Sequence, residues 1–189
     1  MRETLFKYRG LVWGIFAAAV LALPVSLSLP RCCFAAPILL AGQCLRFWAA
    51  GVIPKYRTLS VDAPKLVTRG PYAWVRNPLY AGNGLMGLGW ALMAGWIFVA
   101  AFTALYFALY SLTIIPLEER FLSVRFGEEY EIYKRSTPAL IPDFRDFVFR
   151  ASKSLSGFDR KKSWFMERHS LGMNALVTVL VLVRLYFSR

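Results

Sequence analysis

The chain has 189 residues, of which 57% are hydrophobic and 16% aromatic, and its mean hydropathy is +0.46. A soluble domain of this length normally carries fewer apolar residues, so the composition favours a protein that lies largely in lipid. The formal net charge of +12 comes without a compact basic domain or a platform on which bases could stack. This argues against nucleic acid as a partner and for the anionic headgroups of a membrane.

Apolar stretches long enough to cross a bilayer recur along the chain, at residues 10–29, 34–53, 79–95, 96–117 and 171–187. A helix rising 1.5 Å per residue needs about 20 residues to cross a hydrocarbon core about 30 Å thick. The third and fourth stretches are contiguous, so they must fold back, and the small residues around Gly95 predict a tight helical hairpin there. The first stretch also fits a cleaved signal peptide loosely, but its length and the spans after it favour a retained helix. We therefore predict an all-α integral membrane protein of five transmembrane helices, forming one domain over residues 1–189.

The distribution of Lys and Arg predicts the orientation, because cytoplasmic loops retain positive charge. With five spans, most of the 23 basic residues and all 11 acidic residues fall on one side. Only Arg31 and Arg189 fall in the connections on the other side. We therefore expect the N-terminus, residues 54–78 and residues 118–170 to be cytoplasmic.

The two cytoplasmic segments carry local signals. Gly70-Pro71 indicates an ordered turn in the first segment. In the second, Pro116, acidic residues just after it and Gly127 indicate a short helix that continues or abuts the fourth span. Residues 128–135 are predicted to form a further helical turn or two, and residues 144–164 an interfacial amphipathic helix.

The three cysteines give no metal-site pattern. Cys32, Cys33 and Cys44 are odd in number and have no histidine near them, so no metal is expected. Cys32 and Cys33 are predicted to lie in a short outer loop between the first two spans.

Several motifs share their order and spacing with a known superfamily. Residues 66–72 read LVTRGPY, residues 76–82 read RNPLYAG, residues 118–119 are Glu-Glu, and residues 126–133 read FGEEYEIY. This pattern resembles the isoprenylcysteine carboxyl methyltransferase and phospholipid methyltransferase superfamily, and the likeness runs from about Arg46 to Pro142. The resemblance implies a membrane enzyme that transfers a methyl group from S-adenosylmethionine to a lipid or lipid-like acceptor at the membrane interface. No Gly-x-Gly-x-x-Gly fingerprint is then expected, and the chain has none after a strand.

The class of acceptor stays open in the sequence. Asn77 stands where isoprenylcysteine methyltransferases usually have histidine. Gly89-Trp90 resembles a Gly-Trp pair at a similar place in phosphatidylethanolamine methyltransferases. Both features favour a lipid amine as the methyl acceptor. Carboxyl O-methylation and methylation of a small thiol or amine are alternatives. Two other classes also remain: a sterol-reductase-like membrane oxidoreductase that binds a nicotinamide cofactor, and a non-catalytic membrane scaffold.

The chemistry of S-adenosylmethionine indicates which residues could hold it. Its ammonium needs acidic partners, its carboxylate a cation or amide, and its adenine ring aromatic walls. The expected cofactor-binding residues are Tyr72, Arg76, Asn77, Tyr80, Gly82, Glu118, Glu119 and Tyr130.

Three residues are expected to act on the acceptor: Arg46, Glu119 and Arg135. An amine acceptor must lose a proton, for which a glutamate or a tyrosine is the available base. A carboxylate acceptor would instead be held by an arginine such as Arg46 or Arg135.

Structural roles are the alternatives for several of these residues. In the structural alternative, Asn77 serves as a helix cap without binding cofactor, and Glu118 and Glu119 complement the dipole of a helix N-terminus. For Arg46 the structural alternative is a hydrogen bond to neighbouring backbone, although a charged residue inside a membrane span usually has a functional role. Tyr130 and Tyr133 could anchor the chain at the membrane interface.

Overall fold

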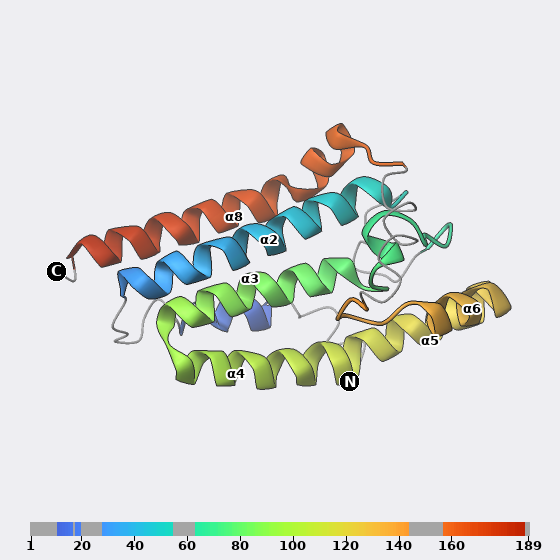
Figure 1. Cartoon of the computed structure of the whole chain (residues 1–189), viewed down its shortest axis with the longest axis horizontal. Coiled ribbons are helices and arrows are strands. Elements are labelled where there is room, and N and C mark those ends of the chain that lie inside the picture. The colour runs from blue at the N-terminus through green and yellow to red at the C-terminus, as the bar shows by residue number, and fades with distance from the viewer. Residues whose placement is uncertain (1–10, 17, 20–27, 55–62, 144–156, 188–189) are drawn as a thin grey trace.

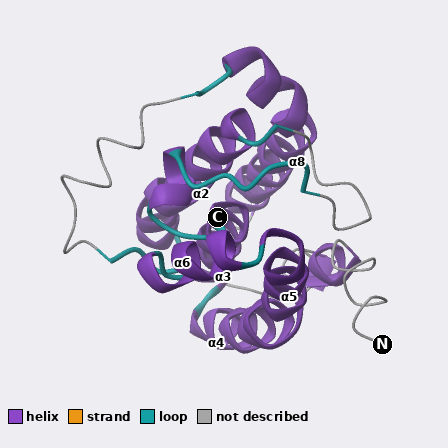
Figure 2. Cartoon of the chain, turned by 90° about the vertical axis from the view of Figure 1, so that its right-hand side faces the viewer, coloured by secondary structure: helices purple, strands orange, loops and turns teal. Residues whose placement is uncertain are grey.

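A computed structural model describes residues 11–16, 18–19, 28–54, 63–143 and 157–187, and these residues contain helices and no strand (Figures 1 and 2). The elements in chain order are α2 (Leu29–Val52), η1 (Gly70–Ala73), α3 (Pro78–Ala94), α4 (Trp96–Tyr106), η2 (Phe107–Ile114), α5 (Ile115–Phe126), α6 (Glu128–Ser136) and α8 (Arg160–Phe187). Residues 11–16, 18 and 19 are also helical. The predicted all-α class is confirmed for this part of the chain.

The helix α2 begins earlier than predicted. Pro30 lies in its first turn, where a missing N–H costs nothing because that donor has no partner within the helix. The backbone nitrogen of Cys32 donates to the carbonyl oxygen of Ser28 at 3.1 Å. The prediction that Cys32 and Cys33 lie in a loop is therefore wrong, since both belong to α2.

The helices α3 and α4 run in opposite directions on either side of Gly95 (Figure 1). Gly95 has φ +130°, a conformation that residues with a Cβ rarely adopt. The other face of α3 packs closely on α2. A Cβ built on Gly82 would lie 2.8 Å from the carbonyl oxygen of Gly42, so small residues allow the two backbones to approach.

One continuous helical stretch runs from Trp96 to Phe126 through α4, η2 and α5. Pro116 lies inside this stretch, where its ring and missing N–H disturb an α-helix. The preceding residues form a π-helix, η2, and the backbone nitrogen of Ile115 still donates to the oxygen of Tyr110, so the helical bonding runs up to the proline. Of the two alternatives, the segment after Pro116 thus continues the fourth apolar stretch, and it ends at Gly127 as predicted.

The C-terminal helix α8 is longer than the predicted fifth span. It begins at Arg160 rather than near residue 171 and lies beside α2 (Figure 1). Most of the predicted amphipathic helix, residues 144–156, falls outside the described residues. The predicted helix after Gly127 is confirmed as α6.

The described helices form a bundle with two distinct ends. The end of α2, the start of α3, α5, α6 and the start of α8 lie toward one end, while the turn between α3 and α4 and the last turns of α8 lie at the other (Figure 1). Within the described part, two helical stretches are long and apolar enough to cross a membrane, Leu29–Val52 and Trp96–Phe126. Five crossings remain a prediction.

Candidate active site

An ion pair at the end of the bundle that carries the motifs joins three helical segments. Arg76, just before α3, donates from Nε and Nη2 to Oε1 of Glu119 on α5, at 2.9 and 2.6 Å. Its Nη1 donates to the backbone oxygens of Lys134, at 2.9 Å, and Thr137. Lys134 Nζ lies 3.3 Å from the other oxygen of Glu119. Because charge-assisted hydrogen bonds are stronger than neutral ones, this cluster fixes α3, α5 and α6 together.

Glu118 lies on a different side of α5 and is almost fully buried, with 1% of its surface exposed. The hydroxyl of Tyr80 donates to Glu118 Oε1 at 2.6 Å. The backbone oxygen of Tyr80 accepts from the hydroxyl of Tyr106 at 2.7 Å. Because the helix is continuous through this region, Glu118 and Glu119 do not lie at a free helix N-terminus.

Asn77 occupies the N-cap position of α3, but its side chain does not cap the helix. Its Nδ2 and its backbone nitrogen donate to the oxygen of Ala139, at 3.3 and 3.1 Å. The backbone nitrogen of Arg76 donates to the oxygen of Pro138 at 2.8 Å. The segment after α6 is therefore held over the start of α3 by two backbone hydrogen bonds and one from the Asn77 side chain.

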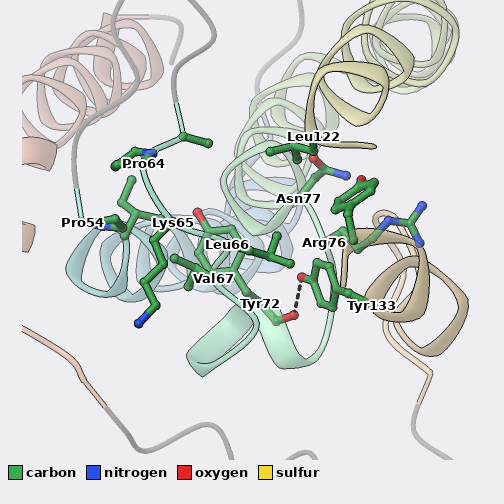
Figure 3. A pocket seen from close by; sticks show the side chains of 13 residues that line it. Pro54, Pro64, Lys65, Leu66, Val67, Tyr72, Arg76, Asn77, Leu122 and Tyr133 are labelled. Atoms are coloured by element: carbon green, nitrogen blue, oxygen red, sulfur yellow. Dashed lines mark hydrogen bonds between the residues drawn. The ribbon is translucent and has the colours of Figure 1, made fainter. Parts of the chain in front are cut away.

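A cavity opens beside this cluster, between the loop at residues 63–67, η1, α5 and α6 (Figure 3). Tyr72, Tyr130 and Tyr133 give it aromatic walls, and Arg76 and Lys65 supply positive charge. The hydroxyl of Tyr133 donates to the backbone oxygen of Tyr72 at 2.7 Å, as Figure 3 shows. Among the expected cofactor-binding residues, this cavity is lined by Tyr72, Arg76, Asn77 and Tyr130.

The remaining expected residues do not line this cavity. Glu119 is bonded to the lining residue Arg76. Tyr80 and Glu118 are bonded to each other and are not among the lining residues. Gly82 faces α2, where a Cβ would lie 2.5 Å from Cγ of Arg46. Gly82 is therefore placed at a helix contact.

The buried hydroxyl of Tyr130 has no acceptor among the described residues, and the Arg76 guanidinium lies close to it. Burial, together with the nearby Glu119 carboxylate, raises the pKa of Tyr130 to about 12. The phenol thus keeps its proton at physiological pH and can donate to a bound group, while it is a poor base.

Arg46 lies apart from this cavity, within the bundle. Its Nε and Nη2 donate to the two oxygens of Glu167 on α8, at 2.9 and 2.8 Å, and its Nη1 donates to Asn83 Oδ1 at 2.5 Å. Only 12% of the Arg46 side chain and none of Glu167 is exposed. Sequence reasoning identified Arg46 but missed both partners.

Arg135 is exposed on α6. Its neighbour Lys134, and not Arg135, is the basic residue of α6 that contacts Glu119. The charged cluster thus includes a lysine that no sequence motif singled out.

Residues 30–129 match the phospholipid methyltransferase family. The chain belongs to this family. The matched region extends from α2 to the start of α6 and leaves α8 outside. No solved structure matches the chain significantly.

Several curated proteins are similar to the chain over part of its length. The nickel-cobalt-cadmium resistance protein NccN of Alcaligenes xylosoxydans xylosoxydans is 38% identical over 129 residues, which cover 64% of this chain and 56% of the relative. The protein-S-isoprenylcysteine O-methyltransferase of Schizosaccharomyces pombe is 36% identical over 78 residues, covering 41% and 33%. The methanethiol S-methyltransferase of Crocosphaera subtropica is 38% identical over 82 residues, covering 41% and 29%. The chain thus spans about half the length of the first of these relatives and less of the others.

Proposed function

We propose that this protein transfers a methyl group from S-adenosylmethionine to a lipid or lipid-like acceptor at the membrane interface. The observation that carries the proposal is the joining of two distant motifs beside an aromatic cavity. Arg76 and Glu119 are 43 residues apart in the chain and form the buried ion pair at its edge. The family relation and the two long apolar helices indicate a membrane protein with methyltransferase relatives.

The residues around the cavity fit the chemistry of S-adenosylmethionine. Lys65 would pair with its carboxylate, assisted by the N–H groups that Arg76 and Asn77 do not use in their bonds to Glu119 and Ala139, and the tyrosine rings would pack against its adenine. The hydroxyl of Tyr130 offers a buried donor that lacks an acceptor among the described residues, and a bound polar group would satisfy it. When bound, the cofactor supplies a methyl group activated by its sulfonium.

The chain's own residues would orient the reactants and exclude water. Arg76 and Glu119 hold α3 against α5 and α6, which keeps the cavity walls in place. Glu118 keeps the Tyr80 hydroxyl oriented. Positioning of this kind accounts for a large part of the rate enhancement in displacement reactions.

The acceptor is proposed to be a lipid amine, with a carboxylate or a thiol as alternatives. For an amine, Glu118 or Glu119 is the base that would accept the proton. Arg46 is a weaker candidate for binding a carboxylate acceptor, because both oxygens of Glu167 already neutralise its guanidinium. Arg135, exposed on α6, keeps that role open.

The proposal also places the N-terminus and the site in the cytoplasm. A cysteine introduced at the exposed Glu128 should react with an impermeant maleimide in inside-out vesicles and resist it in right-side-out vesicles. The opposite pattern would contradict this orientation.

Calorimetric titration of the detergent-purified protein with S-adenosylmethionine tests the cofactor assignment. We expect binding, and we expect Arg76→Ala to weaken it by about tenfold or more, since a charged hydrogen bond contributes about 1.5–3 kcal/mol. Glu128→Gln is the matched control, because Glu128 is exposed on α6 and lies outside the cavity lining. Absence of binding by the folded wild-type protein would overturn the proposal.

A further inference from the structure

A second cavity opens between the first described helix, α3, α4 and α8, and the exposed Met173 lies at its edge. We propose that it binds an uncharged amphiphile, a molecule with an apolar body and one hydrogen-bonding end. This intramembrane cavity shares no lining residue with the cavity beside Arg76. The inference therefore does not depend on methyl transfer.

The walls of the intramembrane cavity suit an apolar body. Trp13, Phe16, Trp90 and Phe102 line it together with methionines. Aromatic and methionine side chains offer a large apolar contact area and adapt to the shape of a chain or a ring. The ring centroids of Trp13 and Phe102 are 5.2 Å apart, so these walls meet across two helices.

Polar groups gather along one part of the same cavity. Asn83, Ser170 and Asn174 line it, and Nδ2 of Asn174 donates to Oε1 of Gln43. Two buried donors nearby have no acceptor among the described residues, the indole nitrogen of Trp90 and Nε2 of Gln43. Buried donors are normally paired. A ligand with a hydroxyl or carbonyl oxygen would accept hydrogen bonds from these two donors.

The charge balance at this polar part selects an uncharged ligand. Asn83 accepts a hydrogen bond from Arg46, whose charge is neutralised by both oxygens of the fully buried Glu167. The nearest ionic groups therefore sum to zero. A carboxylate or ammonium placed here would be an uncompensated charge in a low dielectric, which costs several kcal/mol.

The helix α8 contributes the features that define this site. Glu167, Ser170, Met173 and Asn174 all belong to α8, which lies outside the family match at residues 30–129. The intramembrane cavity thus combines residues of the matched family region on α3 and α4 with residues of α8 that lie outside it.

Photolabelling of the full chain in detergent micelles tests the inference. The probe is a medium-chain alcohol with a diazirine on its alkyl chain, and peptide mass spectrometry locates the labels. We expect saturable labelling of the peptides that contain Trp13 and Met173, with competition by the plain alcohol. The fatty acid and the alkylammonium of equal length should compete about tenfold more weakly or worse. Labelling at the exposed Ile97 should not saturate.

Two variants separate the cavity from general lipid contact. Met173→Trp should reduce the label on the Trp13 peptide, while Val179→Trp, an exposed position of α8 outside the cavity, should not. Glu167→Gln leaves the charge of Arg46 unbalanced and should make the fatty acid the better competitor. If Glu167→Gln fails to fold, the Met173 and Val179 pair decides. Labelling without saturation, equal competition by all three amphiphiles, or no effect of Met173→Trp would overturn the inference.

Discussion

The buried pair of Arg46 and Glu167 makes a quantitative prediction about stability. The two residues are 121 positions apart and are joined by two hydrogen bonds at 2.9 and 2.8 Å, with little or no exposed surface. Removing one partner of such a pair leaves an uncompensated charge away from water, which costs about 3–5 kcal/mol. Glu167→Leu should therefore lower the free energy of unfolding by about that amount.

A double-mutant cycle tests the reasoning. Arg46→Leu should cost less than Glu167→Leu, because an isolated buried glutamate can bind a proton while an arginine keeps its charge. The double variant should be close to the wild type, since apolar residues often replace a buried ion pair at little cost. Equilibrium unfolding in mixed micelles measures all four proteins. Additive losses in the double variant would refute the claim that the two charges compensate each other.

Three further predictions concern the cavity beside Arg76 and the helix contacts. Arg76→Lys should weaken S-adenosylmethionine binding in calorimetric titration, because an ammonium cannot reproduce the fork that bonds Glu119 and two backbone oxygens; affinity equal to the wild type would contradict this. In the wild type, the free energy of unfolding should fall as pH rises from about 10 to about 12, because folding raises the pKa of Tyr130. In urea titrations over this pH range, the free energy of unfolding of Tyr130→Phe should fall less than that of the wild type. An equal fall in both proteins would count against a buried phenol. Gly82→Ala should cost about 1–3 kcal/mol through overpacking, whereas Gly172→Ala, with nothing within 4 Å, should not; equal unfolding free energies would exclude a tight contact at Gly82.

The features that local sequence predicted well are those fixed by local chemistry. Gly127, with φ +53°, ends α5 because a positive φ suits glycine, and the acidic residues after it start α6. The motifs put Arg76 and Glu119 in one candidate binding set and a hairpin was predicted at Gly95, but the direct ion pair between the two residues was not predicted.

The features that sequence missed depend on contacts between distant segments. Nothing near Glu167 in the sequence marks it as the partner of Arg46. Likewise, the local signals at Pro116 predicted a helix that continues or abuts the fourth span without deciding between the two, and no local signal marks the π-helical winding of η2 before it. The side chain of Asn77 donates to the oxygen of Ala139, 62 residues away, and the helix cap considered as its structural alternative does not form.

Transfer of a labelled methyl group tests the central claim most directly. The purified protein is incubated with labelled S-adenosylmethionine and a total membrane extract, and mass spectrometry identifies which molecules gain the label. The account predicts a labelled lipid or lipid-like product with the wild type and with Glu128→Gln, and far less with Arg76→Ala. A wild-type protein that binds S-adenosylmethionine but labels nothing in the extract, or an Arg76→Ala variant as active as the wild type, would contradict it.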